Sequence, residues 1–341
     1  MIKQYKKWVY LFVLFVFTLL FTNVYFLYLA DTFSVITKHP KTLYHTPNQR
    51  HLIIDYLLEH LNQYDTLIMG SSRVWFINPL RLKEATAYNM TYAEGIPHEH
   101  LLNLKFLLKK GMKIRHVILA LDDFSYRVDF NQHQRQLASK LHYKVTGIPK
   151  FEYYKLYLLR LPKKRNIEQL RKKYFNKPLS AQESIVLSKI FDTIYKQSFE
   201  YSKRLGNDVN LSDTRHNNAS IFTQPSYSEG NVLKATLQDL QEIIQLSHTY
   251  KFKLTLFINP IHHATYKATD KVLFDTFKRE LSYLTSYYDF SLPNKINNNN
   301  AYWNDTSHYK YYVGDLILQR LFESKISIKD FGVFVKKEEN L

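Results

Sequence analysis

The chain has 341 residues, 45% of them apolar, a formal net charge of +17 and no cysteine. A sequence without cysteine excludes a disulfide scaffold and a thiolate metal site, so an apolar core must hold the fold together. The length beyond the N-terminal segment is enough for one large domain.

The first element is an apolar run at residues 8–30 that carries no charged residue. At about 1.5 Å per residue this run is long enough to cross the hydrocarbon core of a membrane as one helix. A cleavable signal peptide is the alternative, but the run is too long and no small-x-small cleavage pattern follows it. Lys3, Lys6 and Lys7 precede the run without an acid, which predicts a cytoplasmic tail at 1–7 and an extracytoplasmic domain at 31–341.

Strand and helix patterns alternate beyond the apolar run. Strand patterns cover 65–70, 87–90, 116–122, 253–259 and 287–292, and helical patterns cover 47–62, 97–110, 233–250, 271–286 and 311–321. Such alternation predicts an α/β fold whose parallel sheet is covered by helices on both faces.

A serine follows the first strand pattern. The sequence Gly70-Ser71-Ser72 comes directly after an apolar run, with Gly70 supplying a sharp exit from the strand. The carboxyl ends of parallel strands are where open α/β sheets bind ligands, so a serine of this segment is placed as a candidate nucleophile.

A carboxylate and an imidazole lie three residues apart in Asp305-Thr306-Ser307-His308. At this spacing Asp305 can hold the His308 ring in one tautomer while its other nitrogen takes the proton of the serine. A second D-x-x-H, Asp213 to His216, lies in a polar stretch with no strand pattern before it, and we interpret it as a loop.

These segments together resemble the SGNH (GDSL-like) hydrolase superfamily, in particular its membrane-anchored cell-envelope branch, which includes the lipoteichoic acid D-alanylation protein and the alginate O-acetyltransferases. The resemblance implies a three-layer, flavodoxin-like parallel sheet with Ser72 as nucleophile and Asp305 and His308 as its partners. It also implies that the backbone N–H groups of Ser72 and of Gly95, the glycine after the second strand, hold the oxyanion.

The third block of that superfamily ends in Asn-Asp, and here the sequence departs from it. After the third strand pattern the chain reads Asp122-Asp123-Phe124, with no Asn. An ionised Asp only accepts hydrogen bonds and cannot donate to an oxyanion. This departure favours a slow transferase or an inactive relative over a fast hydrolase.

Four further residues are candidates for substrate binding. Arg73 could bind an anionic group beside the nucleophile, Asn89 and Asn259 could supply the missing oxyanion donor, and His262 could line the cleft; surface or loop-capping roles are the alternatives. A metal site is not expected, because the adjacent His262 and His263 lack acidic partners at suitable spacing.

An insertion at 127–230 separates the third and fourth strand patterns and is far longer than an ordinary connection. Within it, residues 139–177 hold 12 Lys or Arg against two Glu, interleaved with aromatic residues. This composition suits lipid headgroups or an anionic polymer of the envelope, although an ordinary solvated helical face is the alternative.

The sequence therefore predicts a serine esterase or O-acyltransferase, without cofactor, anchored by one span in the inner or cytoplasmic membrane of a bacterium. The expected substrate is an acyl ester of a cell-envelope glycan or polymer. The alternative is a catalytically inactive assembly or binding partner of an envelope-modification system, such as a partner of a membrane-bound acyltransferase. Nucleic acid is not an expected partner, because a basic domain outside the membrane rarely meets it.

Overall fold

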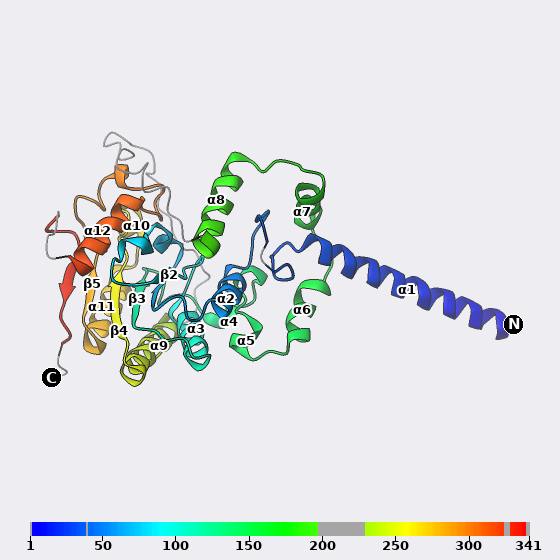
Figure 1. Cartoon of the computed structure of the whole chain (residues 1–341), viewed down its shortest axis with the longest axis horizontal. Helices are drawn as coiled ribbons and strands as arrows, with labels where there is room; N and C mark the ends of the chain where they lie inside the picture. The colour runs from blue at the N-terminus through cyan, green and yellow to red at the C-terminus, as the bar shows by residue number, and fades with distance from the viewer. Residues whose placement is uncertain (1, 39, 197–228, 324–327, 339–341) are drawn as a thin grey trace. The chain divides into compact units, whose positions relative to one another are not determined.

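The computed structural model describes residues 2–38, 40–196, 229–323 and 328–338. By internal contacts the chain divides into two compact units (Figure 1). We call residues 1–52 with 134–191 the anchor unit, and residues 53–133 with 192–341 the sheet unit. Residues 134–191 of the predicted insertion therefore group with the N-terminal segment, a grouping that the sequence patterns did not indicate.

In the described residues the sheet unit contains one six-stranded sheet in the order β2-β1-β3-β4-β5-β6. The strands are β1 (Thr66–Met69), β2 (Ala87–Asn89), β3 (His116–Leu121), β4 (Lys253–Ile258), β5 (Tyr287–Asp289) and β6 (Val333–Val335). The first five pair in parallel, and β6 adds to β5 in the antiparallel direction. The predicted α/β fold with a parallel sheet is confirmed, and the order 2-1-3-4-5 is that of flavodoxin-like sheets. The sixth strand was not predicted.

The helices of the sheet unit lie mainly between its strands. They are α3 (Pro97–Lys109), α4 (Phe130–His133), α9 (Glu229–Tyr250), α10 (His263–Ala268), α11 (Lys271–Leu284) and α12 (Tyr311–Phe322). α3 begins with Pro97 at its first position and is followed by Gly111 with a φ of +87°, as the start and stop signals of the sequence predicted. Helix α2 (Gln49–Glu59) precedes β1 and is divided between the two units.

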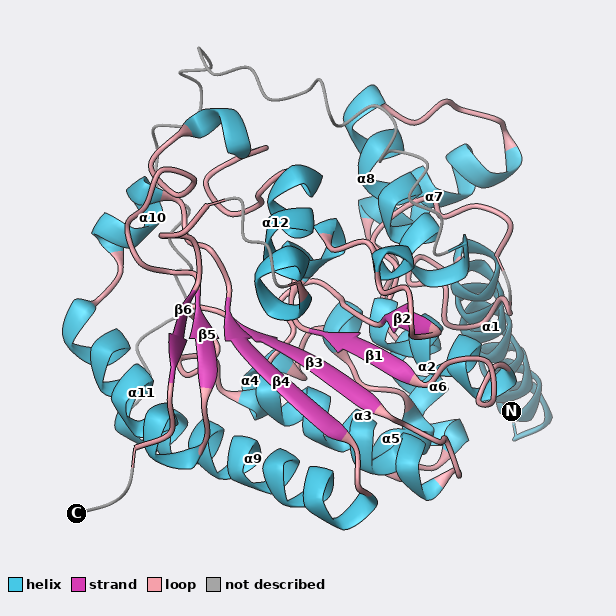
Figure 2. Cartoon of the chain, turned by 60° about the vertical axis from the view of Figure 1, so that its left-hand side comes forward, coloured by secondary structure: helices cyan, strands magenta, loops and turns pink. Residues whose placement is uncertain are grey.

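Helices cover both faces of the sheet (Figure 2). On one face α9 contacts both α3 and α11. On the other face α12 contacts the 3₁₀ turn η1 (Ser72–Phe76), and its residues Val313 and Ile317 pack on Ile68 and Ile118 of the sheet in one buried apolar cluster. The 3₁₀ turn that begins at Ser72 and the helix that follows His308 therefore both lie on this second face.

The strand register brings the predicted site residues to one edge. Ile68 of β1 pairs with Ile118 of β3, and Ile118 pairs with Thr255 of β4, so these strands end at a similar level. The residues that follow these strands therefore leave the sheet at the same carboxyl edge, where open α/β sheets bind ligands.

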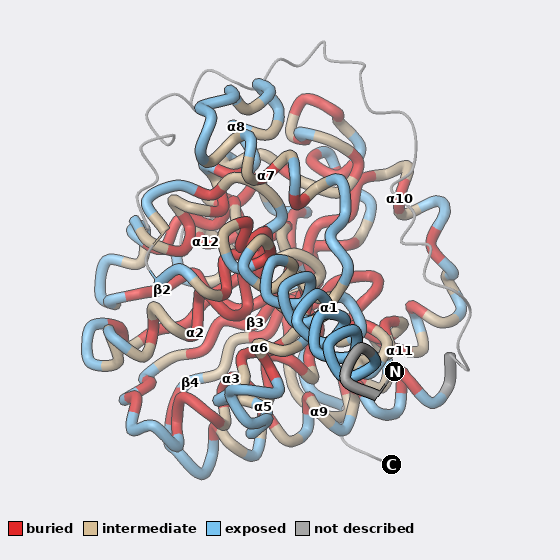
Figure 3. Tube along the Cα trace, turned by 90° about the vertical axis from the view of Figure 1, so that its right-hand side faces the viewer, coloured by how far each residue is buried: buried red, intermediate tan, exposed pale blue. Residues whose placement is uncertain are grey.

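The anchor unit is built from the N-terminal helix α1 (Ile2–Ala30) and the helices of residues 134–191. Those helices are α5 (Tyr143–Thr146), α6 (Lys150–Leu158), α7 (Lys164–Tyr174) and α8 (Ala181–Phe191). Among the described residues α1 alone is long and apolar enough to cross a membrane, over Tyr5–Ala30. Figure 3 shows that α1 is exposed over most of its length, as a membrane-facing helix would be without its lipid.

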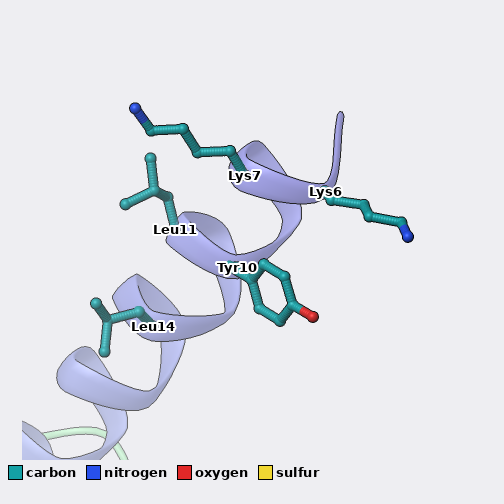
Figure 4. A pocket seen from close by; sticks show the side chains of 5 residues that line it. All are labelled: Lys6, Lys7, Tyr10, Leu11 and Leu14. Atoms are coloured by element: carbon teal, nitrogen blue, oxygen red, sulfur yellow. The ribbon is translucent and has the colours of Figure 1, made fainter. Parts of the chain in front are cut away.

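The start of α1 carries a shallow hollow (Figure 4). Its lining residues, Lys6, Lys7, Tyr10, Leu11 and Leu14, all come from the first turns of this one helix. The hollow is therefore a groove along the outside of an exposed helix and has no wall from any other element. We assign it no binding function.

Candidate active site

The nucleophile turn leaves β1 through Gly70. A Cβ at Gly70 would lie 2.7 Å from Cγ2 of Val74 and 3.0 Å from Cβ of Ala120, so a side chain does not fit where the strand turns away from the sheet. Ser71 then caps the 3₁₀ turn by accepting a hydrogen bond from the backbone N–H of Arg73 at 3.3 Å. Ser72 is the first residue of that turn and remains partly exposed.

The second half of the site is the turn from Asp305 to His308. The carboxylate of Asp305 accepts the backbone N–H groups of Ser307 at 2.7 Å and of His308 at 2.8 Å, so it organises the turn on which it lies. Its other oxygen lies 2.9 Å from Nδ1 of His308. Nε2 of the same ring lies 2.9 Å from Oγ of Ser72.

These distances fix the roles of the two ring nitrogens. An ionised carboxylate can only accept, so Nδ1–H of His308 donates to Asp305 and Nε2 is left to accept the hydroxyl of Ser72. The structure therefore joins Ser72, His308 and Asp305 in one hydrogen-bonded chain, although 236 positions separate the serine from the histidine in the sequence. The arrangement is that of a Ser-His-Asp triad.

The ionised state of Asp305 is secured by its donors. Partial burial would raise the pKa of Asp305, but hydrogen bonds from the His308 side chain and from the backbone of Ser307 and His308 outweigh it and lower the pKa to about 2. Asp305 therefore orients and stabilises the imidazole at any pH at which the triad would work.

Two aromatic residues of the nucleophile turn lie near the imidazole. The ring of Trp75 is stacked with that of His308 at 6.4 Å between centroids, and Phe76 lies at 6.1 Å. The sequence analysis did not single out these two residues. They are three and four positions after Ser72, a spacing that brings residues of a helical turn to the same side and could have indicated them.

Gly95 lies directly against the nucleophile turn. A Cβ at Gly95 would be 2.5 Å from the carbonyl oxygen of Gly70, two residues before Ser72. Glu94, just before it, has a φ of +55°, a left-handed conformation that non-glycine residues seldom adopt. The second motif glycine therefore lies against the nucleophile turn.

Arg73 lies in the interior rather than in the cleft. It is 3% exposed, and its Nη1 lies 3.1 Å from Asp122 and 2.5 Å from Asp123, the pair that follows β3. Burial disfavours the guanidinium cation, but the two carboxylates outweigh this and raise the pKa of Arg73. Burial raises the pKa of Asp122, an effect that Arg73 opposes.

The network around Arg73 reaches both halves of the triad. Asn259 donates from Nδ2 to Asp122 at 3.0 Å, and its Oδ1 accepts the hydroxyl of Tyr309, the residue after His308. Nε of Arg73 also lies 3.5 Å from Oγ of Ser307. These contacts hold the nucleophile turn and the D-x-x-H turn to the ends of β3 and β4.

The remaining substrate-binding candidates are also buried. Asn89 is fully buried and donates from Nδ2 to the carbonyls of Val74 and Ile77. His262 is fully buried, accepts the N–H of Ala264 at Nδ1 and lies 2.8 Å from Oδ1 of Asn300. Since their polar groups bond to the protein, we interpret Asn89, His262, Arg73 and Asn259 as supports of the site and no longer as direct substrate contacts.

No metal or cofactor is expected at this site. The carboxylates nearest to Ser72 accept hydrogen bonds from protein groups: Asp305 from its own turn, and Asp122 and Asp123 from Arg73. The alternative D-x-x-H, Asp213 to His216, lies outside the described residues.

Comparison of the sequence with protein-family models and with curated proteins gives no match. The functional argument therefore depends on the geometry of the site.

Proposed function

We propose that this chain is a membrane-anchored, SGNH-like serine esterase or O-acyltransferase that acts on an acyl ester of a cell-envelope glycan or polymer. The observation that carries the proposal is the hydrogen-bonded chain from Ser72 through His308 to Asp305. A nucleophile, a base and an orienting carboxylate meet at the carboxyl edge of a parallel sheet, with Gly95 against the nucleophile turn.

The proposed reaction begins when Oγ of Ser72 attacks the acyl carbonyl carbon and its proton passes to Nε2 of His308. The negative charge moves to the carbonyl oxygen, which the backbone N–H groups of Ser72 and Gly95 stabilise. The C–O bond to the alcohol then breaks, and the departing oxygen takes the proton from His308, leaving an acyl ester on Ser72.

A second nucleophile completes the cycle by the reverse sequence. Its hydroxyl proton passes to His308, its oxygen attacks the acyl carbon, and Ser72 leaves with the proton that His308 returns. Water gives hydrolysis, and a polymer hydroxyl gives acyl transfer. An N-terminal span favours an acceptor that is fixed in the envelope, and a membrane-bound acyltransferase is a fitting source of acyl groups.

Two observations favour the non-catalytic alternative, in which the fold serves as an assembly or binding partner. The side-chain amides of Asn89 and Asn259 both donate to protein acceptors, and an acidic pair stands where the related superfamily has its Asn donor. Losing one oxyanion donor typically lowers turnover by a factor of about 10²–10³, so a low rate is expected even if the triad is active.

Covalent labelling with a fluorophosphonate separates the two functions without knowledge of the substrate. We expect the full chain in detergent to be labelled, Ser72→Ala and His308→Ala to lose labelling, and His248→Ala, an exposed histidine on α9, to match the parent. Absence of labelling in the parent protein, or labelling that persists in Ser72→Ala, would favour the non-catalytic function.

A further inference from the structure

The end of α1 is embedded in the anchor unit. Nδ2 of Asn23 donates to the carbonyl of Arg160 at 3.0 Å, and Nζ of Lys173 donates to the carbonyl of Leu29 at 3.3 Å. α1 contacts both α6 and α7, and Leu27 is buried. We call residues 159–177, the α6–α7 connection with α7 and the residues after it, the collar; it is bonded to the last two turns of α1.

The charge-free part of α1 that precedes this contact, residues 8–22, is shorter than the hydrocarbon core of a membrane. Residues 8–22 are almost all exposed, and at 1.5 Å per residue they span about 22 Å. A hydrocarbon core is about 30 Å thick and needs about 20 helical residues. A span that begins at Trp8 therefore continues to about Leu27, beyond the point where Asn23 is bonded to the collar.

The exposed side chains of the collar are of the kinds found at the edge of a membrane. Leu161 is 83% exposed and Phe175 is 79% exposed, values unusual for large apolar side chains in water. The exposed cations Lys163, Lys164 and Arg171 lie in the same segment. Apolar side chains beside cations are the composition of segments that lie in the interface between lipid headgroups and acyl chains.

We propose that the collar is a membrane-interface site in the leaflet at the C-terminal end of α1, where it binds anionic phospholipid. Leu161 lies at the boundary between acyl chains and headgroups, and Lys163, Lys164 and Arg171 contact the lipid phosphates. This inference rests on the proposed membrane span but not on the proposed chemistry of Ser72.

The two bonds to α1 also set a gradient of depth. Leu29 is six residues beyond Asn23 on the helix, or about 9 Å farther from the membrane centre. Leu161 follows the residue bonded to Asn23, whereas Phe175 is two residues after the lysine bonded to Leu29. Leu161 is therefore the deeper of the two side chains.

Depth can be measured with single spin labels, because the chain has no native cysteine. Leu14→Cys, Leu161→Cys and Phe175→Cys are each labelled in the full chain, reconstituted in nanodiscs, and compared for collision with oxygen and with a water-soluble nickel chelate. We expect the ratio of oxygen to nickel collisions to fall from Leu14 to Leu161 to Phe175. The proposal would be overturned if a label at Leu161 collided with the nickel chelate as often as the free label does in water.

The Leu14 label separates failure of the collar from failure of the span. Lipid exposure at Leu14 with full water exposure at Leu161 would refute the collar alone, whereas water exposure at Leu14 would refute the span and the collar together. Fluorophosphonate labelling of Ser72 would be unaffected in either case, so the chemical proposal is tested separately.

Lipid preference tests the cations. The full chain is extracted from mixed phosphatidylglycerol and phosphatidylcholine membranes, and the phosphatidylglycerol retained is measured beside the variant Lys163→Gln, Lys164→Gln, Arg171→Gln. We expect severalfold enrichment in the parent, and loss of it in the variant and at high salt. The matched control, Lys234→Gln, Lys267→Gln, Lys329→Gln, removes equal charge from the sheet unit; an equal loss there would show that only net charge matters and would overturn the proposal.

Discussion

Replacing Arg73 with Met should strongly destabilise the sheet unit while leaving its apolar contacts largely in place. Arg73 is 3% exposed, and its guanidinium lies within 3.1 Å of both Asp122 and Asp123. Its removal leaves two carboxylates in the interior without their cation. Removing one partner of a buried ion pair typically costs about 3–5 kcal/mol.

The magnitude can be expressed as a melting shift. For domains of the size of the sheet unit, each kcal/mol of lost stability lowers the melting temperature by about 2–4 °C. The melting temperature of Arg73→Met should therefore be lower by about 6–20 °C. Thermal unfolding of the full chain in detergent, followed by circular dichroism, measures it. The combined variant Arg73→Met, Asp122→Asn, Asp123→Asn should recover most of the loss, because the unpaired charges are gone.

Two results would refute this reasoning. An unchanged midpoint in Arg73→Met would show that the interior tolerates the two carboxylates, either protonated or hydrated. A combined variant as unstable as Arg73→Met would show that the arginine matters through packing and not through charge.

Three further predictions follow from the site and the span. Gly95→Ala should lower the rate of fluorophosphonate labelling by a factor of about 10²–10³ with little loss of secondary structure. The reason is that the Cβ of the alanine would press on the carbonyl of Gly70 and displace the proposed oxyanion donor. Labelling at the rate of the parent would show that Gly95 takes no part in the site. The pKa of Asp305 falls from 3.8 to about 2 on folding, so the ionised carboxylate stabilises the fold fully above about pH 4, and this stabilisation is lost as the pH falls towards 2. The difference in melting temperature between the parent and Asp305→Asn should therefore be constant above about pH 4 and shrink below it. A difference that already shrinks between pH 7 and pH 5 would contradict this prediction. A reporter fused after Leu341 should be active only outside the cytoplasm, as Lys3, Lys6 and Lys7 predict, and cytoplasmic activity would reverse the proposed orientation.

The sheet and the triad could be anticipated because local signals and chain order determine them. The five apolar runs predicted the five parallel strands to within a few residues, and Pro97 and Gly111 marked the ends of α3. Ser72 and the D-x-x-H turn both come after parallel strands, and the carboxyl ends of parallel strands lie at one edge of the sheet.

The supporting residues could not be anticipated in the same way. Arg73, Asn89, Asn259 and His262 are polar, and a sequence pattern does not show whether a polar side chain faces the cleft or bonds inside the protein. The pairing of Arg73 with Asp122 joins residues 49 positions apart, and it depends on how the ends of β1 and β3 meet. β6 was not predicted because a strand of three residues is too short to show a recognisable alternation of apolar and polar residues.

The grouping of the N-terminal segment with the insertion also escaped the sequence. It depends on contacts such as that between Asn23 and the carbonyl of Arg160, which lie 137 positions apart. The charge of the insertion was visible in the sequence, but its attachment to α1 was not.

The most direct test of the central claim is to trap the acyl group on Ser72. The full chain is incubated with an activated ester such as p-nitrophenyl acetate, quenched with acid and mapped by peptide mass spectrometry. We expect one acetyl group on Ser72, absent in Ser72→Ala and strongly reduced in Asp305→Asn. A Ser72 that stays unmodified while the ester is turned over, or equal acetylation of the parent and Asp305→Asn proteins at Ser72, would contradict the proposed triad.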